Sequence, residues 1–275
     1  MTRIAVLQMT TGIDPATNAL TLTAAIGAAG QGDATMIFTP EMSGLLDRNR
    51  ERGRAHIVVE DANPVLAAVR DAAARAGVWV ALGSLAVLRE DGRFANRSLL
   101  VDPNGKIAAR YDKIHMFDVD LASGESWRES SAYAPGEALA VAETPLGRLG
   151  LTVCYDLRFP ALFEALGRAG CDAIAIPAAF TVPTGAAHWH VLQRARAIEA
   201  SAFVIAAAQV GTHEDGRHTY GHSLVIDPWG EVLLDMGGTE PGLAFAELDL
   251  ARIAEVRAQL PSLANRRAIP KWVSP

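Results

Sequence analysis

The chain has 275 residues, a formal net charge of −6 and an isoelectric point of about 5.7, and 50% of its residues are hydrophobic. A sizeable core can therefore form, and without a basic arm or a Lys/Arg cluster among aromatic residues nucleic-acid binding has little support. The longest apolar runs are too short to span a bilayer, and the N-terminus lacks the order of a signal peptide. Because Cys154 and Cys171 are the only cysteines, a disulfide scaffold is excluded and a cytoplasmic location is expected.

Apolar, β-branched runs alternate with alanine-rich segments along the whole sequence. Their periodicity predicts strands at 4–9, 34–39, 79–88, 97–102, 106–111, 149–154, 173–178, 203–210, 222–227, 231–236 and 243–248. It predicts helices at 15–30, 62–76, 160–169, 186–201 and 251–259. This order favours an α/β fold with mixed sheets covered by helices. Because no linker interrupts the pattern, we expect one domain over 1–275.

Three short segments share one turn chemistry: DPNG at 102–105, TPLG at 144–147 and DPWG at 227–230. Proline presets φ at the second position of each turn and glycine relaxes the last, so each segment is expected to close a hairpin. The tail over 260–275 is punctuated by proline and carries Ile269 and Trp272 with little local structure to pack against. Such a tail is typical of a segment that packs on another subunit.

Several common site motifs are missing from the sequence. It contains neither the G-x-S-x-G turn of serine hydrolases nor the glycine-rich loops that bind phosphates and dinucleotides. His188 and His190 fall on a predicted helix, where an i,i+2 pair points to different sides. No set of cysteines and histidines has zinc-ligand spacing. We therefore expect neither a metal nor a cofactor.

Three reactive side chains stand where predicted strands end. Glu41 closes ATMIFTPE, Lys113 follows KIAARYD, and Cys154 closes RLGLTVC. Ligands of α/β sheets bind beyond the carboxyl ends of strands. A carboxylate can take the proton of a thiol, and an ammonium can stabilise both a thiolate and the oxyanion formed when sulfur attacks an amide. The N–H of Tyr155 could supply a second oxyanion donor.

Each of these residues also has an ordinary structural explanation. A cysteine at a strand end is usually a small buried hydrophobe, which is how we interpret Cys171. Glu41 could be a solvated loop charge, and Lys113 could form a surface ion pair with Asp112. Lysine is rare here, however, because only three of the 25 basic residues are lysines. The lysine at position 113 is therefore unusual for this chain, which suggests that it has a specific function.

Longer segments around the three residues resemble the nitrilase superfamily, the carbon–nitrogen hydrolases. The matching segments are FTPEM, RYDKIHMFDVD and GLTVCYDLRFP, followed by 176–199 and 221–233. They appear in the family's order over nearly the whole chain. The resemblance implies an αββα sandwich that pairs into dimers or larger assemblies through the helix after Cys154 and the C-terminal tail. It also implies that Cys154 is the nucleophile, Glu41 the base and Lys113 the cationic partner.

The family has a second glutamate near the nucleophile, in the loop that follows the lysine. Glu129 matches its usual position best, while Glu125 and Glu137 are alternatives. The resemblance implies that this glutamate holds Lys113 and positions the substrate amide.

The segment 206–223 resembles the branch that hydrolyses deaminated glutathione, a γ-amide of an α-keto acid, to 2-oxoglutarate and cysteinylglycine. Arg158 is a candidate for the keto-acid carboxylate, with pairing to Asp156 as the structural alternative. The expected cavity lining also includes Phe180, Thr181, His188 and Trp189, the last two with helix-to-sheet packing as the alternative.

Other functions stay open from the sequence. Within the superfamily the chain could be an ω-amidase acting on 2-oxoglutaramate, or an N-carbamoyl hydrolase. A non-catalytic binding protein on the same fold and a metal-dependent hydrolase are alternatives of other classes. In each catalytic case the partner is a small-molecule substrate, with no membrane or nucleic acid.

Overall fold

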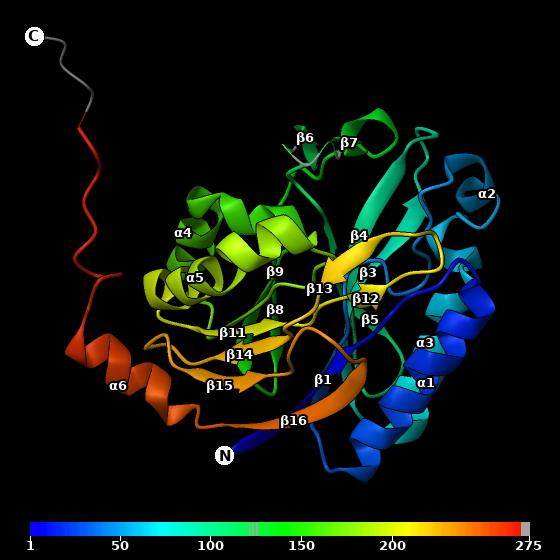
Figure 1. Ribbon diagram of the computed structural model, residues 1–275. Helices are drawn as coiled ribbons and strands as arrows, with labels where there is room; N and C mark the ends of the chain where they lie inside the picture. Colours follow the sequence, from blue (N-terminus) through cyan, green and yellow to red (C-terminus); the bar gives the residue numbers. More distant parts are fainter. Residues whose placement is uncertain (121, 123, 125, 271–275) are drawn as a thin grey trace, which may run out of the picture.

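The fold is a sandwich of two six-stranded sheets, each with helices on its outer face, in the computed structural model (Figure 1). The structure describes residues 1–120, 122, 124 and 126–270. Helices α1 and α3 cover the first sheet, and α4 and α5 cover the second. This arrangement is the αββα sandwich expected from the sequence.

The first sheet has the order β16-β1-β2-β3-β4-β5, and the second has the order β15-β14-β11-β10-β9-β8. The first sheet's strands are β1 (Thr2–Gln8), β2 (Met36–Phe38), β3 (Trp79–Leu88), β4 (Phe94–Val101), β5 (Ile107–Asp112) and β16 (Gly242–Leu248). Those of the second are β8 (Ala140–Thr144), β9 (Gly147–Leu151), β10 (Ala173–Ala175), β11 (Phe203–Ala206), β14 (Leu224–Ile226) and β15 (Val232–Asp235).

The helices are α1 (Pro15–Gln31), α2 (Arg50–Arg54), α3 (Pro64–Ala76), α4 (Pro160–Arg168), α5 (Val182–Ala200) and α6 (Ala251–Gln259). Two small ribbons, β6 (Asp118–Asp120) with β7 (Ser126–Arg128) and β12 (Val210–Thr212) with β13 (His218–Tyr220), stand apart from the main sheets. Three 3₁₀ turns cover Glu60–Ala62, Glu129–Ser131 and Cys154–Arg158.

Alternation along the strands builds the two layers of core. In β1, Ile4 and Val6 face the second sheet, whereas Ala5 and Leu7 face the helices on the outer side. This is the period-two pattern of a strand buried on both faces. It explains why β1 contains the continuous apolar run Ile4–Leu7.

The three turn predictions are confirmed. DPNG joins β4 to β5, TPLG joins β8 to β9, and DPWG joins β14 to β15, each as an antiparallel pair. In two of them the last glycine donates its N–H to the carbonyl of the first aspartate: Gly105 to Asp102 and Gly230 to Asp227, each at 2.9 Å.

Predicted elements and observed elements differ mainly where segments are short. The predicted strand 203–210 divides into β11 and β12, and α5 begins at Val182 rather than 186, with Pro183 in its first turn, where a missing N–H costs nothing. The periodicity did not predict α2, β6, β7, β8 or β13, which span only three to five residues each.

The C-terminal segment leaves the body of the molecule after α6 (Figure 1). Arg266 donates to the carbonyls of Glu164 and Glu199 at 3.0 and 3.1 Å, but Ile269 is 90% exposed. Trp272 lies outside the described residues. Among the residues described, no helix is both long and apolar enough to cross a membrane.

Candidate active site

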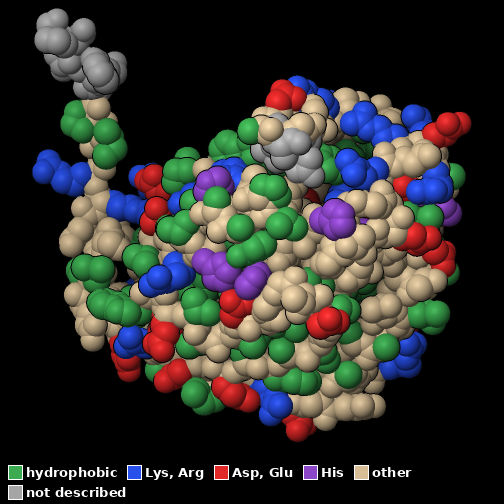
Figure 2. Space-filling view, viewed as in Figure 1, with side chains coloured by type: hydrophobic (Ala, Val, Ile, Leu, Met, Phe, Trp, Pro, Cys, Tyr) green, Lys and Arg blue, Asp and Glu red, His purple; other side chains and the backbone are tan. Residues whose placement is uncertain are grey.

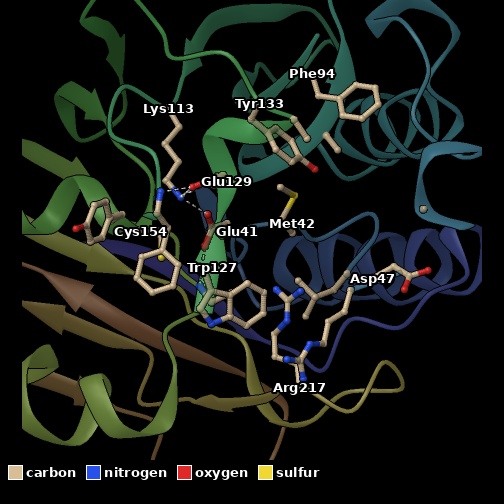
Figure 3. Close-up of a pocket in the computed structure, with 18 of the residues that line it drawn as sticks. Glu41, Met42, Asp47, Phe94, Lys113, Trp127, Glu129, Tyr133, Cys154 and Arg217 are labelled. Atoms are coloured by element: carbon tan, nitrogen blue, oxygen red, sulfur yellow. Dashed lines mark hydrogen bonds and ion pairs between the residues drawn. The ribbon is translucent and has the colours of Figure 1, made fainter. Parts of the chain in front are cut away.

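Strand directions bring the three strand-end residues to one place. β4 runs antiparallel to both β3 and β5, so β5 runs parallel to β3 and β2, and their carboxyl ends share one edge. Glu41 follows β2 and Lys113 follows β5 at this edge, while Cys154 follows β9 in the facing sheet. Figure 3 shows the three side chains directed toward one another.

Lys113 lies between two carboxylates. Its Nζ donates to Glu41 Oε1 at 3.0 Å and to the two oxygens of Glu129 at 2.8 and 3.1 Å (Figure 3). The Lys113 side chain is only 2% exposed, and those of Glu41 and Glu129 are 6% and 13% exposed. Phe117 donates its N–H to Glu129 at 2.7 Å, which fixes this carboxylate from its other side.

Of the three candidate second glutamates, Glu129 is the one that the structure places against Lys113. Glu137 is exposed, and Glu125 lies outside the described residues.

Asn96 is a member of this cluster that the sequence did not indicate. It lies near the start of β4, at the same sheet edge, and its Nδ2 donates to Glu41 at 2.9 Å and to Glu129 at 3.1 Å. Its carbonyl also accepts the N–H of Lys113 at 2.9 Å. One asparagine therefore ties both carboxylates and the lysine backbone together. Nothing in the segment FANRS distinguishes it from an ordinary strand residue.

The loop that carries Glu41 approaches β3 more closely than any side chain would allow. A Cβ at Gly83 would lie 2.1 Å from the carbonyl oxygen of Thr39 and 2.3 Å from that of Pro40. The next residue, Ser84, accepts the N–H of Met42 at 2.9 Å, and the register of β3 against β4 shifts at this point. Glycine is required here so that the backbone after β2 can pack onto the neighbouring strand.

Cys154 occupies a strained backbone position. Its φ is +50°, a left-handed conformation that non-glycine residues seldom adopt outside functional sites. The residue begins the 3₁₀ turn Cys154–Arg158 and donates its N–H to the carbonyl of Pro177 at 2.8 Å. This sharp turn directs the thiol toward the Glu41 carboxylate (Figure 3).

Asp156 connects the cysteine turn to the lysine loop. Its carboxylate is fully buried and accepts the Val153 N–H at 2.9 Å and the Tyr111 hydroxyl at 2.7 Å. It also accepts the N–H of His115 at 3.1 Å, with the Nδ1 of this histidine 2.7 Å away. Because Tyr111 and His115 flank Lys113, Asp156 holds the nucleophile and the cation in one relative position.

Burial and charge determine the protonation states at the site. Burial alone would raise the pKa of Glu41, but Lys113 and the hydrogen bonds from Cys154 and Asn96 bring it below its ordinary value. Burial opposes the charge on Lys113, yet Glu129 and Glu41 raise its pKa well above the usual range. Burial and Glu41 together raise the pKa of the Cys154 thiol well above its ordinary value. The resting state is therefore a neutral thiol beside an ionised glutamate and a protonated lysine.

An open cavity lies over this cluster. Glu41, Lys113, Glu129 and Cys154 form part of its wall, together with Tyr155, Arg158, Phe180 and Thr181 from the expected substrate-binding set. The sequence did not indicate the rest of the lining, including Phe117, Trp127, Tyr133 and Arg217. These residues come from short ribbons and turns that carry no periodic pattern.

Two expectations about this wall need correction, and one structural alternative is not observed. Trp189 is fully buried behind Phe180, with ring centroids 4.8 Å apart and its Nε1 donating to the His222 carbonyl at 2.7 Å, so it packs in the core. His188 is exposed and contacts Arg158 at 3.2 Å rather than the cavity. Arg158 does not pair with Asp156, whose carboxylate is occupied by Tyr111 and His115. Instead its guanidinium lies over the rings of Tyr155 and Phe180.

A group of potential metal ligands lies elsewhere. Donor atoms of His190, His222 and Asp235 lie within 4.8 Å of one another. His190 and His222 each contact the Asp235 carboxylate, at 3.0 and 2.9 Å. Spacing along the sequence could not indicate this group, because its members come from α5, a loop and β15.

Known proteins share both the sequence and the fold. Residues 3–258 match the family model described as carbon-nitrogen hydrolase. The chain is 41% identical to a deaminated glutathione amidase from Yersinia enterocolitica, over 98% of this chain and 94% of that one. The chain therefore belongs to the carbon–nitrogen hydrolase family, whose members form the nitrilase superfamily, and it is an enzyme that hydrolyses carbon–nitrogen bonds.

Solved structures agree with this assignment. The NitFhit protein of Caenorhabditis elegans has a TM-score of 0.89 and 35% identity, over 97% of this chain and 65% of that chain. A mutant of the amidase from Nesterenkonia sp. AN1, with the acetamide moiety of fluoroacetamide covalently added at its active site cysteine, has a TM-score of 0.82 and 26% identity. That match covers 97% of this chain and 94% of the other.

The Asp156 contacts predict a measurable loss of stability. Asp156→Ala leaves two buried N–H groups, a hydroxyl and an imidazole without their acceptor, and should lower the free energy of unfolding by about 3–5 kcal/mol. Asp120→Ala is the control, because Asp120 pairs with Arg128 at the surface and its loss should cost less than about 1 kcal/mol. Urea denaturation of both variants measures this, and equal small losses would contradict the role of Asp156.

Proposed function

We propose that the chain hydrolyses deaminated glutathione to 2-oxoglutarate and cysteinylglycine. The observation that carries this proposal is the Glu41–Lys113–Glu129 cluster against Cys154, at the wall of a cavity lined by several arginines. Deaminated glutathione is an amide that carries carboxylates at both ends, so a basic cavity suits it. The name of the Yersinia relative supports the same substrate.

The first half of the reaction forms a thioester. Glu41 accepts the proton of the Cys154 thiol as the sulfur attacks the amide carbonyl, because this carboxylate is ionised and lies beside the thiol. Nζ of Lys113 and the N–H of Tyr155 stabilise the oxyanion of the tetrahedral intermediate. Glu41 then gives its proton to the nitrogen, the carbon–nitrogen bond breaks, and cysteinylglycine leaves as the amine.

The second half releases the acid. Glu41, again ionised, takes a proton from a water molecule that attacks the thioester carbonyl. The carbon–sulfur bond breaks, and the proton on Glu41 returns to Cys154. The products are 2-oxoglutarate and the starting enzyme. Glu129 keeps Lys113 in place through both halves, and every proton transfer in this sequence uses groups of the chain and water.

We also propose that the enzyme is a cytoplasmic homodimer, with the helix after Cys154 and the segment 260–275 at the interface. Val191 and Ile198 are 62% and 42% exposed on α5, which packs beside α4, and the segment leaves the body of the molecule (Figure 1). Exposed apolar side chains next to a segment that leaves the body of the molecule are typical of a covered surface. Light scattering of the purified chain should give twice the mass of one chain, and a stable monomer would contradict this proposal.

The catalytic assignment predicts specific losses of turnover. Cys154→Ala should abolish release of 2-oxoglutarate, and Glu41→Gln should lower kcat by about 10²–10⁴-fold because the base is lost. Cys171→Ala is the matched control, since Cys171 is a fully buried core residue whose burial raises its pKa to about 11. Product release by the three variants measures this, and wild-type turnover by Cys154→Ala would overturn the assignment.

A further inference from the structure

A second cationic region of the cavity involves Trp127 and two arginines. Trp127 lies on β7, Arg217 lies in the turn between β12 and β13, and Arg48 precedes α2. The guanidinium carbons of Arg217 and Arg48 lie 4.6 and 5.2 Å from the centre of the Trp127 ring. All three residues line the cavity, and Figure 3 shows Trp127 between Cys154 and Arg217.

Arg217 lacks the partners that a buried guanidinium needs. Its side chain is 17% exposed, and its one ion pair within the described part of the chain is with Asp215, at 3.4 Å. Its Nε is buried without a hydrogen-bond partner, as is the Nε1 of Trp127. In contrast, Arg52 binds Asp47 through two hydrogen bonds of 2.6 and 2.9 Å. A buried cation with such a weak partner is costly, unless an anion from outside the chain completes it.

The charged side chains that line the cavity are mostly basic. Its described lining contains one lysine and six arginines, but only three acidic residues. Two of those acids hold Lys113, and Asp47 is held by Arg52, which does not line the cavity. In Figure 2 the basic side chains gather at the upper right, over the region of α2 and the β6–β7 ribbon. Arg128 pairs with Asp120, which does not line the cavity, so the positive charge that the protein leaves available to an anionic ligand comes from the other arginines.

We propose that Arg217, together with Arg48, binds the glycine carboxylate of the cysteinylglycine half of the substrate. This inference rests on the proposed function, which places deaminated glutathione in the cavity. Arg158 lies over Tyr155, the residue next to the nucleophile, and suits the keto-acid carboxylate, which is few bonds from the scissile carbonyl. Arg217 lies on the far side of Trp127 from Cys154 (Figure 3). It therefore suits the glycine carboxylate, which a whole residue separates from the scissile nitrogen. The guanidinium can bind this carboxylate through two parallel hydrogen bonds.

This assignment makes Arg217 a specificity residue for the amine half of the substrate. It explains why the turn 213–217 folds toward the catalytic cluster. The Nδ1 and Nε2 of His213, which is buried, lie 2.9 and 2.7 Å from the carbonyl of Thr11 and the hydroxyl of Thr219, so the turn is held in place without using the Arg217 guanidinium. The guanidinium is then free for a ligand.

The experiment compares two substrates that differ only in the proposed group: deaminated glutathione and its analogue with a C-terminal glycinamide. In the wild-type enzyme we expect kcat/KM to be about 10–100-fold higher for the carboxylate than for the amide, mainly through KM. In Arg217→Gln this preference should fall to about twofold or less, while turnover of the amide stays near the wild-type value. Arg217→Lys should keep part of the preference because the charge is retained.

Arg128→Gln is the matched control, because Arg128 also lines the cavity but is 49% exposed and pairs with Asp120. Arg128→Gln removes one positive charge from the cavity, as Arg217→Gln does, but it should keep the wild-type preference for the carboxylate over the amide substrate. If Arg217→Gln does not fold, as judged by its Tm, Arg48→Gln should show the same loss of preference. An unchanged preference in the folded variants, or an equal loss for both substrates, would overturn the assignment of Arg217. Failure of the wild-type enzyme to hydrolyse deaminated glutathione would instead refute the proposed function.

Discussion

The site depends on one buried ammonium held between two carboxylates. Lys113 neutralises only one of the two charges on Glu41 and Glu129, so the cluster keeps one net negative charge away from solvent. Burial opposes a thiolate at Cys154, and a thiolate would add a second negative charge there, so the thiol stays protonated at rest. The positive charge of Lys113 and the hydrogen bonds that Glu41 accepts keep this carboxylate ionised and able to accept the proton. The reaction that we propose therefore uses general base catalysis rather than a preformed thiolate.

The fold supplies this charge arrangement from four separate strands. Glu41 and Lys113 come from strand ends at one edge of the first sheet, Asn96 comes from the start of β4 at that edge, and Cys154 comes from the second sheet. Asp156 then joins the two sheets at the site through Tyr111 and His115. Because each charged group has a fixed neighbour, the cost of burying the charges is offset by hydrogen bonds that also set the geometry.

Local patterns in the sequence predicted mixed sheets covered by helices, the three hairpin turns and the placement of Glu41, Lys113 and Cys154 at strand ends, while the sandwich was implied by the resemblance to the nitrilase superfamily. The sequence could not predict Asn96 or the role of Asp156, since the side chains that they contact lie 33 to 55 residues away in the sequence and depend on how the sheets pack. The same limit explains why the sequence left open a pairing of Arg158 with Asp156, which the structure does not show. Arg217 and Trp127 lie in short ribbons whose position is set by tertiary contacts, so no periodicity marks them.

The pH dependence of alkylation at Cys154 by iodoacetamide tests the central claim most directly. With the thiol neutral and the pKa of Glu41 held below its ordinary value, the rate should change by less than about twofold between about pH 6 and pH 8. In Glu41→Gln no carboxylate is present to take the thiol proton. The alkylation rate should then rise with pH as the thiol ionises, by up to about tenfold per pH unit. A wild-type rate that rises in this way, or a thiolate already formed at pH 6, would contradict the account.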